Sequence, residues 1–467
     1  MSNMTLRCWQ SKFHDIIKKK FEQGETNFSL LAAPGSGKTI AVATKIRIMF
    51  EQEKIDYVIC ISPSTNITNT TKDLMESVLG RSFDSVCSVG VCLTYQKLFH
   101  LSKAYFIELK SKRVLLFLDE VHRTAKEYNK WAHKIEELVI PIADYIIVAT
   151  GTPTRGDGRP LSCVSYNQDG KIVSGYEYTM SQAVSDGVCR PPVVHLIDSE
   201  EISIVSNKNS KKLFLSINES LTHIKYADIL NNHDFIFAML NLTFNKLSMV
   251  KRVNPTAACL VIAIDTKHAR FIEMIIRNNF NYKVAVVYFD KSDSTEIIKR
   301  FNASDDDVLI AVKMVSEGVD INRLQVACYL SNIRTDSYIR QVLGRIQRVR
   351  SQDMDKYCYF FTPSHSDILN VIDTVTEFVP DAHVIKINIK SSKKNDNKKA
   401  NVTADMLSTG NDLNAGNDDK KSKASPLIIQ VGTVKYHENE ILKISEKIKE
   451  DIINFYEKSD ELTHHLT

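Results

Sequence analysis

Short runs that are apolar at every position recur along the chain, and stretches of helical length separate them. Such runs are typical of strands that are buried on both faces of a parallel sheet. The runs are "YVICI" (57–61), "VLLFL" (114–118), "YIIVAT" (145–150), "CLVIAI" (259–264), "VAVVYF" (284–289), "VLIAV" (308–312), "VACYL" (326–330) and "YCYFF" (357–361). They form two clusters, before and after roughly 190–250. The pattern therefore predicts two α/β domains with parallel sheets.

We place the first domain at 1–192, a connecting helical region at 193–250 and the second domain at 251–390. Residues 391–426 are polar, so we expect a disordered linker there.

The segment 427–467 reads as a strand, "LIIQVGTV", followed by an amphipathic helix. Apolar residues mark one face of that helix, at Ile441, Ile444, Ile448, Ile452 and Phe455. We expect this face to pack on its own domain, and a protein partner is the alternative.

A glycine-rich turn joins the first apolar segment to a helical pattern, in the stretch "LLAAPGSGKTIAVATKI" (30–46). Its core fits the phosphate-binding loop, with Ala32 in place of the usual first glycine. Gly35, Ser36 and Gly37 let backbone N–H groups face phosphate oxygens at the start of a helix. Lys38 is positioned to reach the β- and γ-phosphates of ATP, and the Thr39 hydroxyl to ligate Mg²⁺.

Two adjacent carboxylates end the buried run of "RVLLFLDEVHRTA". Asp119 can hold Mg²⁺ across from Thr39, and Glu120 can orient and deprotonate the attacking water. An acidic strand end that merely faces solvent is the alternative, but the order after the phosphate loop favours a nucleotide site.

Composition and charge narrow the class of protein without naming a substrate. The chain has 467 residues, 43% of them hydrophobic and 25% charged, which is ordinary for globular domains. Its net charge of +4 permits nucleic-acid binding without indicating it. The nine cysteines form no CxxC pair, which predicts neither a zinc site nor a disulfide framework. No apolar run suits a signal peptide or a membrane span, so we expect a cytoplasmic protein with no membrane partner.

The motifs together resemble superfamily 2 helicases and translocases of the DEAD/DEAH-box type, in particular type III restriction helicases from bacteria or phages. The resemblance covers roughly residues 5–365, and the order of its motifs makes it specific. It rests on Arg7-Cys8-Trp9-Gln10, the phosphate loop, "SPSTNIT" (62–68), Thr94-Tyr95-Gln96, "DEVH" (119–122), "ATGTPTR" (149–155), "MVSEGVDI" (314–321) and "QVLGRIQR" (341–348). The segment 166–192 also looks like the one that joins the two motor domains in such proteins.

The resemblance implies two tandem RecA-like domains with the ATP site in the cleft between them. It assigns Arg7 and Gln10 to the adenine, and Gly318 and Asp320 to the nucleotide ribose and the bound strand. It makes Gln341, Arg345 and Arg348 catalytic residues of the second domain, the arginines acting on transferring phosphate. Nucleic-acid contact falls to Ser64, Thr65, Thr94 and Tyr95, and coupling to His122, Thr150 and Thr152.

These features predict an ATP-dependent nucleic-acid helicase. DNA is favoured over RNA by analogy with bacterial and phage members. One alternative is a duplex translocase or remodeller that does not separate strands, as a subunit of a restriction or phage-defence system. Another is an ATP-gated clamp that binds nucleic acid without moving. The sequence leaves the direction of movement and the biological pathway open.

Overall fold

The computed structural model divides into two compact units. Unit 1 comprises Met1–Asp198 and His223–Ile387, and unit 2 comprises Ser199–Thr222 and Asn388–Thr467. The structure describes residues 6–85, 87–98, 100–120, 133–151, 163–168, 172–199, 202–205, 211–288, 294–312, 321–377, 379–389 and 428–431. The expected linker at 391–426 and the expected C-terminal helix lie outside the described residues.

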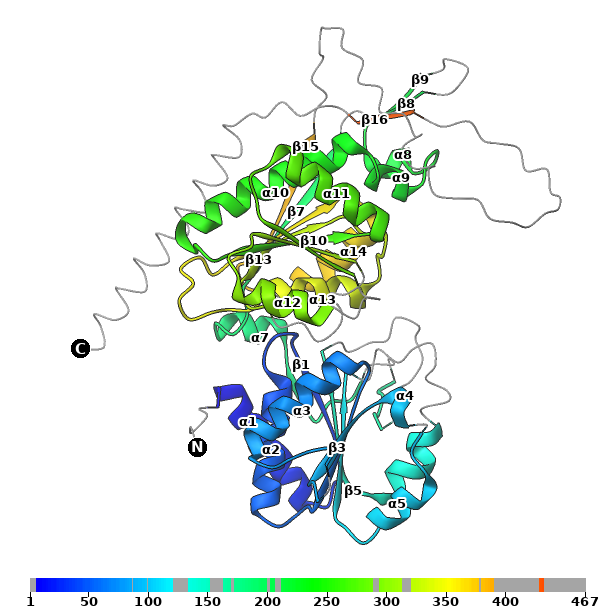
Figure 1. The fold of residues 1–467 in the computed structure, drawn as a ribbon, viewed down its shortest axis with the longest axis vertical. Helices are drawn as coiled ribbons and strands as arrows, with labels where there is room; N and C mark the ends of the chain where they lie inside the picture. Colours follow the sequence, from blue (N-terminus) through cyan, green and yellow to red (C-terminus); the bar gives the residue numbers. More distant parts are fainter. Residues whose placement is uncertain are drawn as a thin grey trace, which may run out of the picture. The chain divides into compact units, whose positions relative to one another are not determined.

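The N-terminal part of unit 1 is built on a six-stranded sheet, which we call the N-terminal lobe (Figure 1). Its strand order is β3-β2-β4-β5-β1-β6, and its strand pairs are parallel. The strands are β1 (Asn27–Ala32), β2 (Tyr57–Ser62), β3 (Gly90–Thr94), β4 (Val114–Asp119), β5 (Ala143–Thr150) and β6 (Tyr176–Tyr178). The helices are α1 (Cys8–Glu22), α2 (Lys38–Glu51), α3 (Thr65–Leu79), α4 (Tyr95–Leu98), α5 (Lys103–Leu109), η2 (Ile135–Val139), η3 (Ile140–Ile142) and α7 (Met180–Ser185).

Two hydrophobic cores cover the two faces of this sheet, and successive strand residues alternate between them. In β2, Val58 and Cys60 join the core beneath α1, α2 and α3, while Ile59 and Ile61 join the core beneath α5 and η2. Side chains along a strand point to opposite faces, so a strand buried on both faces must be apolar at every position. This alternation explains why the strands appear in the sequence as unbroken apolar runs.

The C-terminal part of unit 1 is built on a seven-stranded sheet, which we call the C-terminal lobe. Its strand order is β11-β12-β10-β13-β14-β7-β15, and the pairs from β11 to β7 are parallel. Figure 1 shows α10 and α11 on one side of this sheet and α12 and α13 on the other. The strands are β7 (Pro192–Ser199), β10 (Ala258–Ala263), β11 (Val284–Tyr288), β12 (Val308–Val312), β13 (Leu324–Tyr329), β14 (Cys358–Pro363) and β15 (His383–Ile389). The helices are α9 (Tyr226–Leu230), α10 (His233–Val253), α11 (Thr266–Asn279), α12 (Ser294–Ala303), α13 (Asp336–Ile346) and α14 (Ser366–Thr376).

The predicted fold class, two α/β domains with parallel sheets, is confirmed by these two sheets. The stretch 193–250 differs from the connecting helical region that we expected. Its first residues belong to β7, which pairs with β14 from Cys358↔Pro192 to Pro363↔Ile197. Near its end, α10 contacts β13 and β14. The C-terminal lobe therefore begins at Pro192 and recruits a strand and a long helix that we had assigned to a connection.

Unit 2 contains a small antiparallel sheet in the order β16-β8-β9. It joins β8 (Ile202–Val205) and β9 (Lys211–Phe214) to β16 (Ile428–Val431), and α8 (Ile217–Ser220) contacts β9. The strand β16 lies within the "LIIQVGTV" segment. Among the described residues, no helix is both long and apolar enough to cross a membrane.

A buried ion pair fixes the chain where it enters the C-terminal lobe. The Arg190 guanidinium pairs with Asp353, and both side chains are almost completely buried. Arg190 Nη1 also donates to the carbonyl oxygens of Leu324 (3.0 Å) and Ile346 (3.1 Å). Burial lowers the pKa of Arg190, and the neighbouring Asp353 carboxylate opposes that shift. The junction therefore depends on a charge that has been removed from water.

We predict that Asp353→Ala destabilises unit 1 by about 3–5 kcal/mol, because it leaves the Arg190 charge buried without its counter-charge. Urea-induced unfolding followed by circular dichroism measures the loss. The control is Asp305→Ala, whose partner Lys283 lies 2.7 Å away but whose pair is 61% and 83% exposed. Water and salt screen an exposed pair of this kind, so its loss should change the free energy of unfolding little. Equal losses in the two variants would contradict a special role for the buried pair.

Candidate nucleotide-binding site

The phosphate-binding loop lies between β1 and α2, and its glycines adopt conformations that other residues avoid. Gly35 has φ 79° and Gly37 has φ 94°, both in the left-handed region. Space is also limited, since a Cβ on Gly35 would lie 3.3 Å from Arg348 Cγ and one on Gly37 would lie 3.2 Å from Gln10 Nε2. The Ser36 hydroxyl is buried and has no hydrogen-bond partner among the described residues. A loop with an unsatisfied buried hydroxyl at a helix N-terminus suits an anionic ligand.

Oxygen ligands for a hard cation lie beside this loop. Asp119 ends β4 and is 3% exposed. The Thr39 hydroxyl, in the first turn of α2, lies 3.5 Å from Asp119 Oδ2. A hydroxyl and a carboxylate, with phosphate oxygens to complete the set, are ligands that Mg²⁺ accepts. The residues present therefore fit a Mg²⁺–nucleotide.

Glu120 follows Asp119 and is held in a strained conformation. Its φ is 49°, which is uncommon for a residue other than glycine, and its N–H donates to the carbonyl of Ala149 (2.9 Å). Its carboxylate forms an ion pair with Lys38, and the two side chains are 19% and 8% exposed, respectively. In this structure the loop lysine is therefore neutralised by the carboxylate that we expect to act as the base.

Arg7 and Gln10, at the start of α1, contact the backbone of the loop. Arg7 Nη1 donates to the Ser36 carbonyl (2.8 Å), and Gln10 Nε2 donates to the Gly37 carbonyl (3.2 Å). The two residues also bind each other, since the Arg7 N–H donates to Gln10 Oε1 (2.9 Å). They thus hold the loop in shape, and their expected contact with adenine stays a prediction.

A cavity of about 520 Å³ brings residues of both lobes together. Its lining includes Arg7, Gln10, Gly35, Gly37, Lys38, Thr39, Asp119, Glu120, Arg345 and Arg348. Burial lowers the pKa of Arg348 to about 10, so its guanidinium still carries a charge at neutral pH. Gln341 lies on α13 but is not among the described residues that line this cavity. The cavity therefore contains most of the residues that we expected to bind the nucleotide. Arg345 of α13 and Arg348, just after this helix, line the cavity, whereas Gln341 does not.

Helix α13 can approach the loop because residue 344 has no side chain. A Cβ on Gly344 would lie 2.6 Å from Pro34 Cβ, which is closer than real Cβ atoms come to their neighbours. Two backbone contacts reinforce the approach: an isolated bridge between Cys189 and Arg348, and a hydrogen bond from the Arg190 N–H to the Gln347 carbonyl (2.6 Å). A side chain at position 344 would clash with Pro34, which explains why the Q-x-x-G-R motif has a glycine here.

The expected nucleic-acid residues differ in how accessible they are. Thr65 is exposed and Ser64 is partly exposed, although the Ser64 hydroxyl also caps α3 by accepting from the Ile67 N–H (3.5 Å). Thr94 is 4% exposed, and its hydroxyl accepts from the Lys97 N–H (3.1 Å). Tyr95 is 1% exposed and packs in a hydrophobic core. The expected contact between Tyr95 and nucleic acid is therefore wrong for this conformation, because a side chain inside the hydrophobic core cannot reach a bound nucleic-acid strand.

Of the expected coupling residues, Thr150 ends β5 and is 3% exposed. The others, His122 and Thr152, lie outside the described residues, as do Gly318 and Asp320.

Sequence reasoning missed several residues of the cavity wall, among them Thr70 and Thr71 on α3, Val188 and Asn322. Thr70, Thr71 and Asn322 occupy no recognisable motif, and Val188 lies in the segment 166–192 without a role of its own, so only the folded chain identifies them.

Comparison with known families agrees with this geometry. The family model described as "Type III restriction enzyme, res subunit" matches residues 3–155, which include the phosphate loop and Glu120. The model described as "Helicase conserved C-terminal domain" matches residues 243–350, which include Arg345 and Arg348.

The chain is also similar to two uncharacterized mycobacterial proteins. One, from Mycobacterium leprae, is 26% identical over 384 residues, which is 78% of this chain and 63% of the relative. Another, from Mycobacterium tuberculosis, is 25% identical over 387 residues, with coverages of 79% and 63%. The chain thus spans less than two thirds of the length of these relatives.

Solved structures with a similar fold include restriction and RNA-bound proteins. A fragment assigned as the HsdR subunit of a type I restriction enzyme from Vibrio vulnificus aligns with TM-score 0.57 and 17% identity, covering 82% of this chain and 68% of the fragment. An ATP-dependent type ISP restriction-modification enzyme bound to DNA gives TM-score 0.57 and 14% identity, with coverages of 84% and 32%. Dbp5 from S. cerevisiae, bound to RNA and ADP BeF3, aligns with TM-score 0.53 and 10% identity, covering 83% of this chain and 91% of Dbp5.

These structural likenesses concern the fold, and they identify the two parallel-sheet lobes as tandem RecA-like domains. The two matching family models indicate that the chain is similar to superfamily 2 helicases, with a motor like that of type III restriction enzymes.

Proposed function

We propose that this chain is an ATP-dependent motor that uses hydrolysis to move along or unwind nucleic acid, with DNA as the favoured substrate. The observation that carries this proposal is the cavity in which Lys38, Thr39, Asp119 and Glu120 face Arg345 and Arg348 of the other lobe. When bound, Mg²⁺–ATP supplies a phosphoryl group whose transfer to water releases free energy for movement.

Each side chain of the cavity has a proposed task. Lys38 and the loop N–H groups bind the phosphates, while Thr39 and Asp119 hold the metal ion. Glu120 orients a water molecule and accepts its proton. Arg345 and Arg348 neutralise charge that develops on the transferring group.

Hydrolysis depends on how the two lobes are arranged, because Arg345 and Arg348 belong to one lobe and the phosphate loop belongs to the other. Because they belong to the C-terminal lobe, charge stabilisation requires α13 to lie against the phosphate loop, as Gly344 allows. We infer that Ser64 and Thr65 contact the strand backbone, since hydroxyl groups suit phosphate and sugar rather than base edges.

A second candidate is a duplex translocase that does not separate strands, acting within a restriction system. Two of the proteins with a similar fold are described as restriction enzymes, and one of them is bound to DNA. Strand-displacement and translocation assays distinguish the two candidates, because a translocase displaces a roadblock from duplex without releasing single strands.

The proposal predicts that nucleic acid stimulates the ATPase with little dependence on base sequence. The measurement compares the hydrolysis rate with single-stranded DNA, duplex DNA, forked DNA and RNA of several sequences. Binding to single strands should weaken with salt, with a log–log slope near −0.7 per phosphate neutralised. A rate that no polynucleotide changes would argue for an ATPase that acts on protein alone.

We predict that a change in the N-terminal lobe abolishes ATP binding, whereas a change in the C-terminal lobe slows hydrolysis and leaves binding intact. We expect Lys38→Ala to lose ATP binding, because it removes the charge that meets the phosphates. Arg348→Ala should bind ATP with nearly normal affinity but lose about 10³-fold or more in turnover. The control is Arg277→Ala, an exposed arginine on α11. Normal turnover in Arg348→Ala would remove this residue from the catalytic set.

Glu120→Gln should slow hydrolysis by about 10²–10⁴-fold, because a carboxamide cannot accept the proton of the attacking water. The same change breaks the Lys38–Glu120 ion pair and frees the lysine for phosphate, so ATP affinity should rise. Single-turnover hydrolysis and equilibrium binding measure the two effects, with the exposed Glu51→Gln as control. Unchanged turnover would show that Glu120 is not the base.

A further inference from the structure

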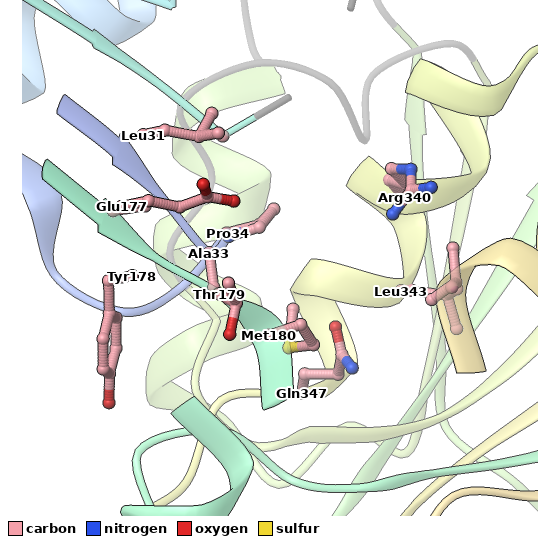
Figure 2. Close-up of a pocket in the computed structure, with 13 residues that line it drawn as sticks. Leu31, Ala33, Pro34, Glu177, Tyr178, Thr179, Met180, Arg340, Leu343 and Gln347 are labelled. Atoms are coloured by element: carbon pink, nitrogen blue, oxygen red, sulfur yellow. The ribbon is translucent and has the colours of Figure 1, made fainter. Parts of the chain in front are cut away.

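A second, smaller cavity of about 180 Å³ is lined by both lobes and by the first residues of the phosphate-loop segment. The N-terminal lobe contributes Pro34, Thr179 and Met180, and the C-terminal lobe contributes Leu343 and Gln347 of the α13 segment. Figure 2 shows these side chains together, with the Gln347 amide beside Met180. Leu343 and Gln347 occupy variable positions of the "QVLGRIQR" segment, and the resemblance assigns neither of them a role.

The Gln347 side chain is the unexplained group in this cavity. The residue is 1% exposed, yet neither Oε1 nor Nε2 has a hydrogen-bond partner among the described residues. Leaving buried polar atoms without partners is costly, and proteins rarely do so without a reason. The result does not depend on which way the amide is oriented, because both of its ends lack a partner.

The backbone prevents Gln347 from turning away to find a partner. Its N–H donates to the Leu343 carbonyl (3.1 Å), and its carbonyl accepts from the Arg190 N–H (2.6 Å). Gln347 also directly follows α13, which Gly344 brings against Pro34. The amide is thus presented to the cavity by a fixed scaffold, which is what a binding site requires.

The size and the walls of the cavity indicate what fits. A cavity of about 150 Å³ holds benzene, so this volume accepts one substituted six-membered ring. Leu343, Met180 and Pro34 provide apolar walls for the faces of a ring, while the amide can exchange two hydrogen bonds with its edge.

At the rim, Glu177 and Arg340 come from different lobes, and Figure 2 draws their charged ends on opposite sides of the space. Arg340 Nε already donates to both carboxylate oxygens of Asp336 at 2.9 Å. The charge of Arg340 is therefore partly compensated by Asp336. The lining groups that most need hydrogen-bond partners are the two ends of the neutral Gln347 amide. A neutral ligand suits the site better than an anion.

We propose that this cavity is a second ligand site, which binds a small planar neutral lactam or imide and thereby links the two lobes. The ring N–H of the ligand donates to Gln347 Oε1, and its adjacent carbonyl accepts from Gln347 Nε2. Because the walls come from both lobes, the occupant stabilises the arrangement in which α13 contacts the phosphate loop. Its binding is therefore coupled to nucleotide binding in the neighbouring cavity, and the coupling is reciprocal.

The test uses uracil as the probe, with 1,3-dimethyluracil as a control that keeps the ring but lacks the N–H donors. Calorimetric titration of the full chain should show saturable uracil binding and at least a tenfold weaker response to the dimethyl compound. Because this comparison uses the unaltered protein, it does not depend on whether a variant folds. No saturable binding of uracil, or equal binding of the two compounds, would overturn the proposal.

A variant then tests the residue. Gln347→Leu should abolish uracil binding while leaving the melting temperature equal or higher, since it removes an unsatisfied buried amide. Gln52→Leu, at an exposed position, serves as the matched control and should bind uracil normally. Uracil binding that persists in Gln347→Leu would place the ligand elsewhere and refute the assignment.

The link between the lobes has its own readout. Saturating uracil should tighten Mg²⁺–ADP binding, and Mg²⁺–ADP should tighten uracil binding by the same factor. ADP binding needs no hydrolysis, so this experiment does not depend on the motor activity proposed above. Uracil binding that is indifferent to ADP would refute the link.

Discussion

The parallel arrangement of both sheets is the constraint on which the rest of the molecule depends. Parallel strands end at the same edge of a sheet, so residues that follow different strands meet there. In the N-terminal lobe the phosphate loop follows β1, Ser64 follows β2, Asp119 and Glu120 lie at the end of β4, and Thr150 ends β5. Segments as far apart in the chain as the phosphate loop and Thr150 therefore reach one edge of the sheet. The proposed nucleotide site is a consequence of this edge.

Closing the site requires a second contact, between α13 and the phosphate loop. Helices usually approach with side chains between their backbones, at 8–10 Å between axes. Gly344 removes that spacer and lets α13 touch Pro34. The same contact sets the position of Arg348 beside Gly35 and of Gln347 beside the smaller cavity. One missing side chain thus determines the geometry of both cavities.

The segment that enters the C-terminal lobe, Cys189 and Arg190, also contacts the residues that follow α13. Cys189 forms a bridge with Arg348, and Arg190 binds both Gln347 and Asp353 within two residues of the start of β7. The connection is therefore packed against α13 and the residues after it. A change in the arrangement of the lobes must alter the hydrogen bonds of this segment as well as those of the phosphate loop.

The sequence by itself determined the class of fold, the phosphate loop and the strands β2, β4, β5, β10, β11, β12, β13 and β14. These features depend on local patterns: a strand buried on both faces must be apolar throughout, and a phosphate loop needs glycines at fixed spacing before a lysine. Only the tertiary structure decided that Pro192–Ser199 joins the second sheet, because strand pairing depends on which neighbour remains open. Likewise, the sequence of Thr94 and Tyr95 matches a motif that contacts nucleic acid in similar proteins, but the Tyr95 ring packs in a hydrophobic core. The unsatisfied amide of Gln347 has no sequence signal at all, since whether a polar atom has a partner depends on every residue that surrounds it.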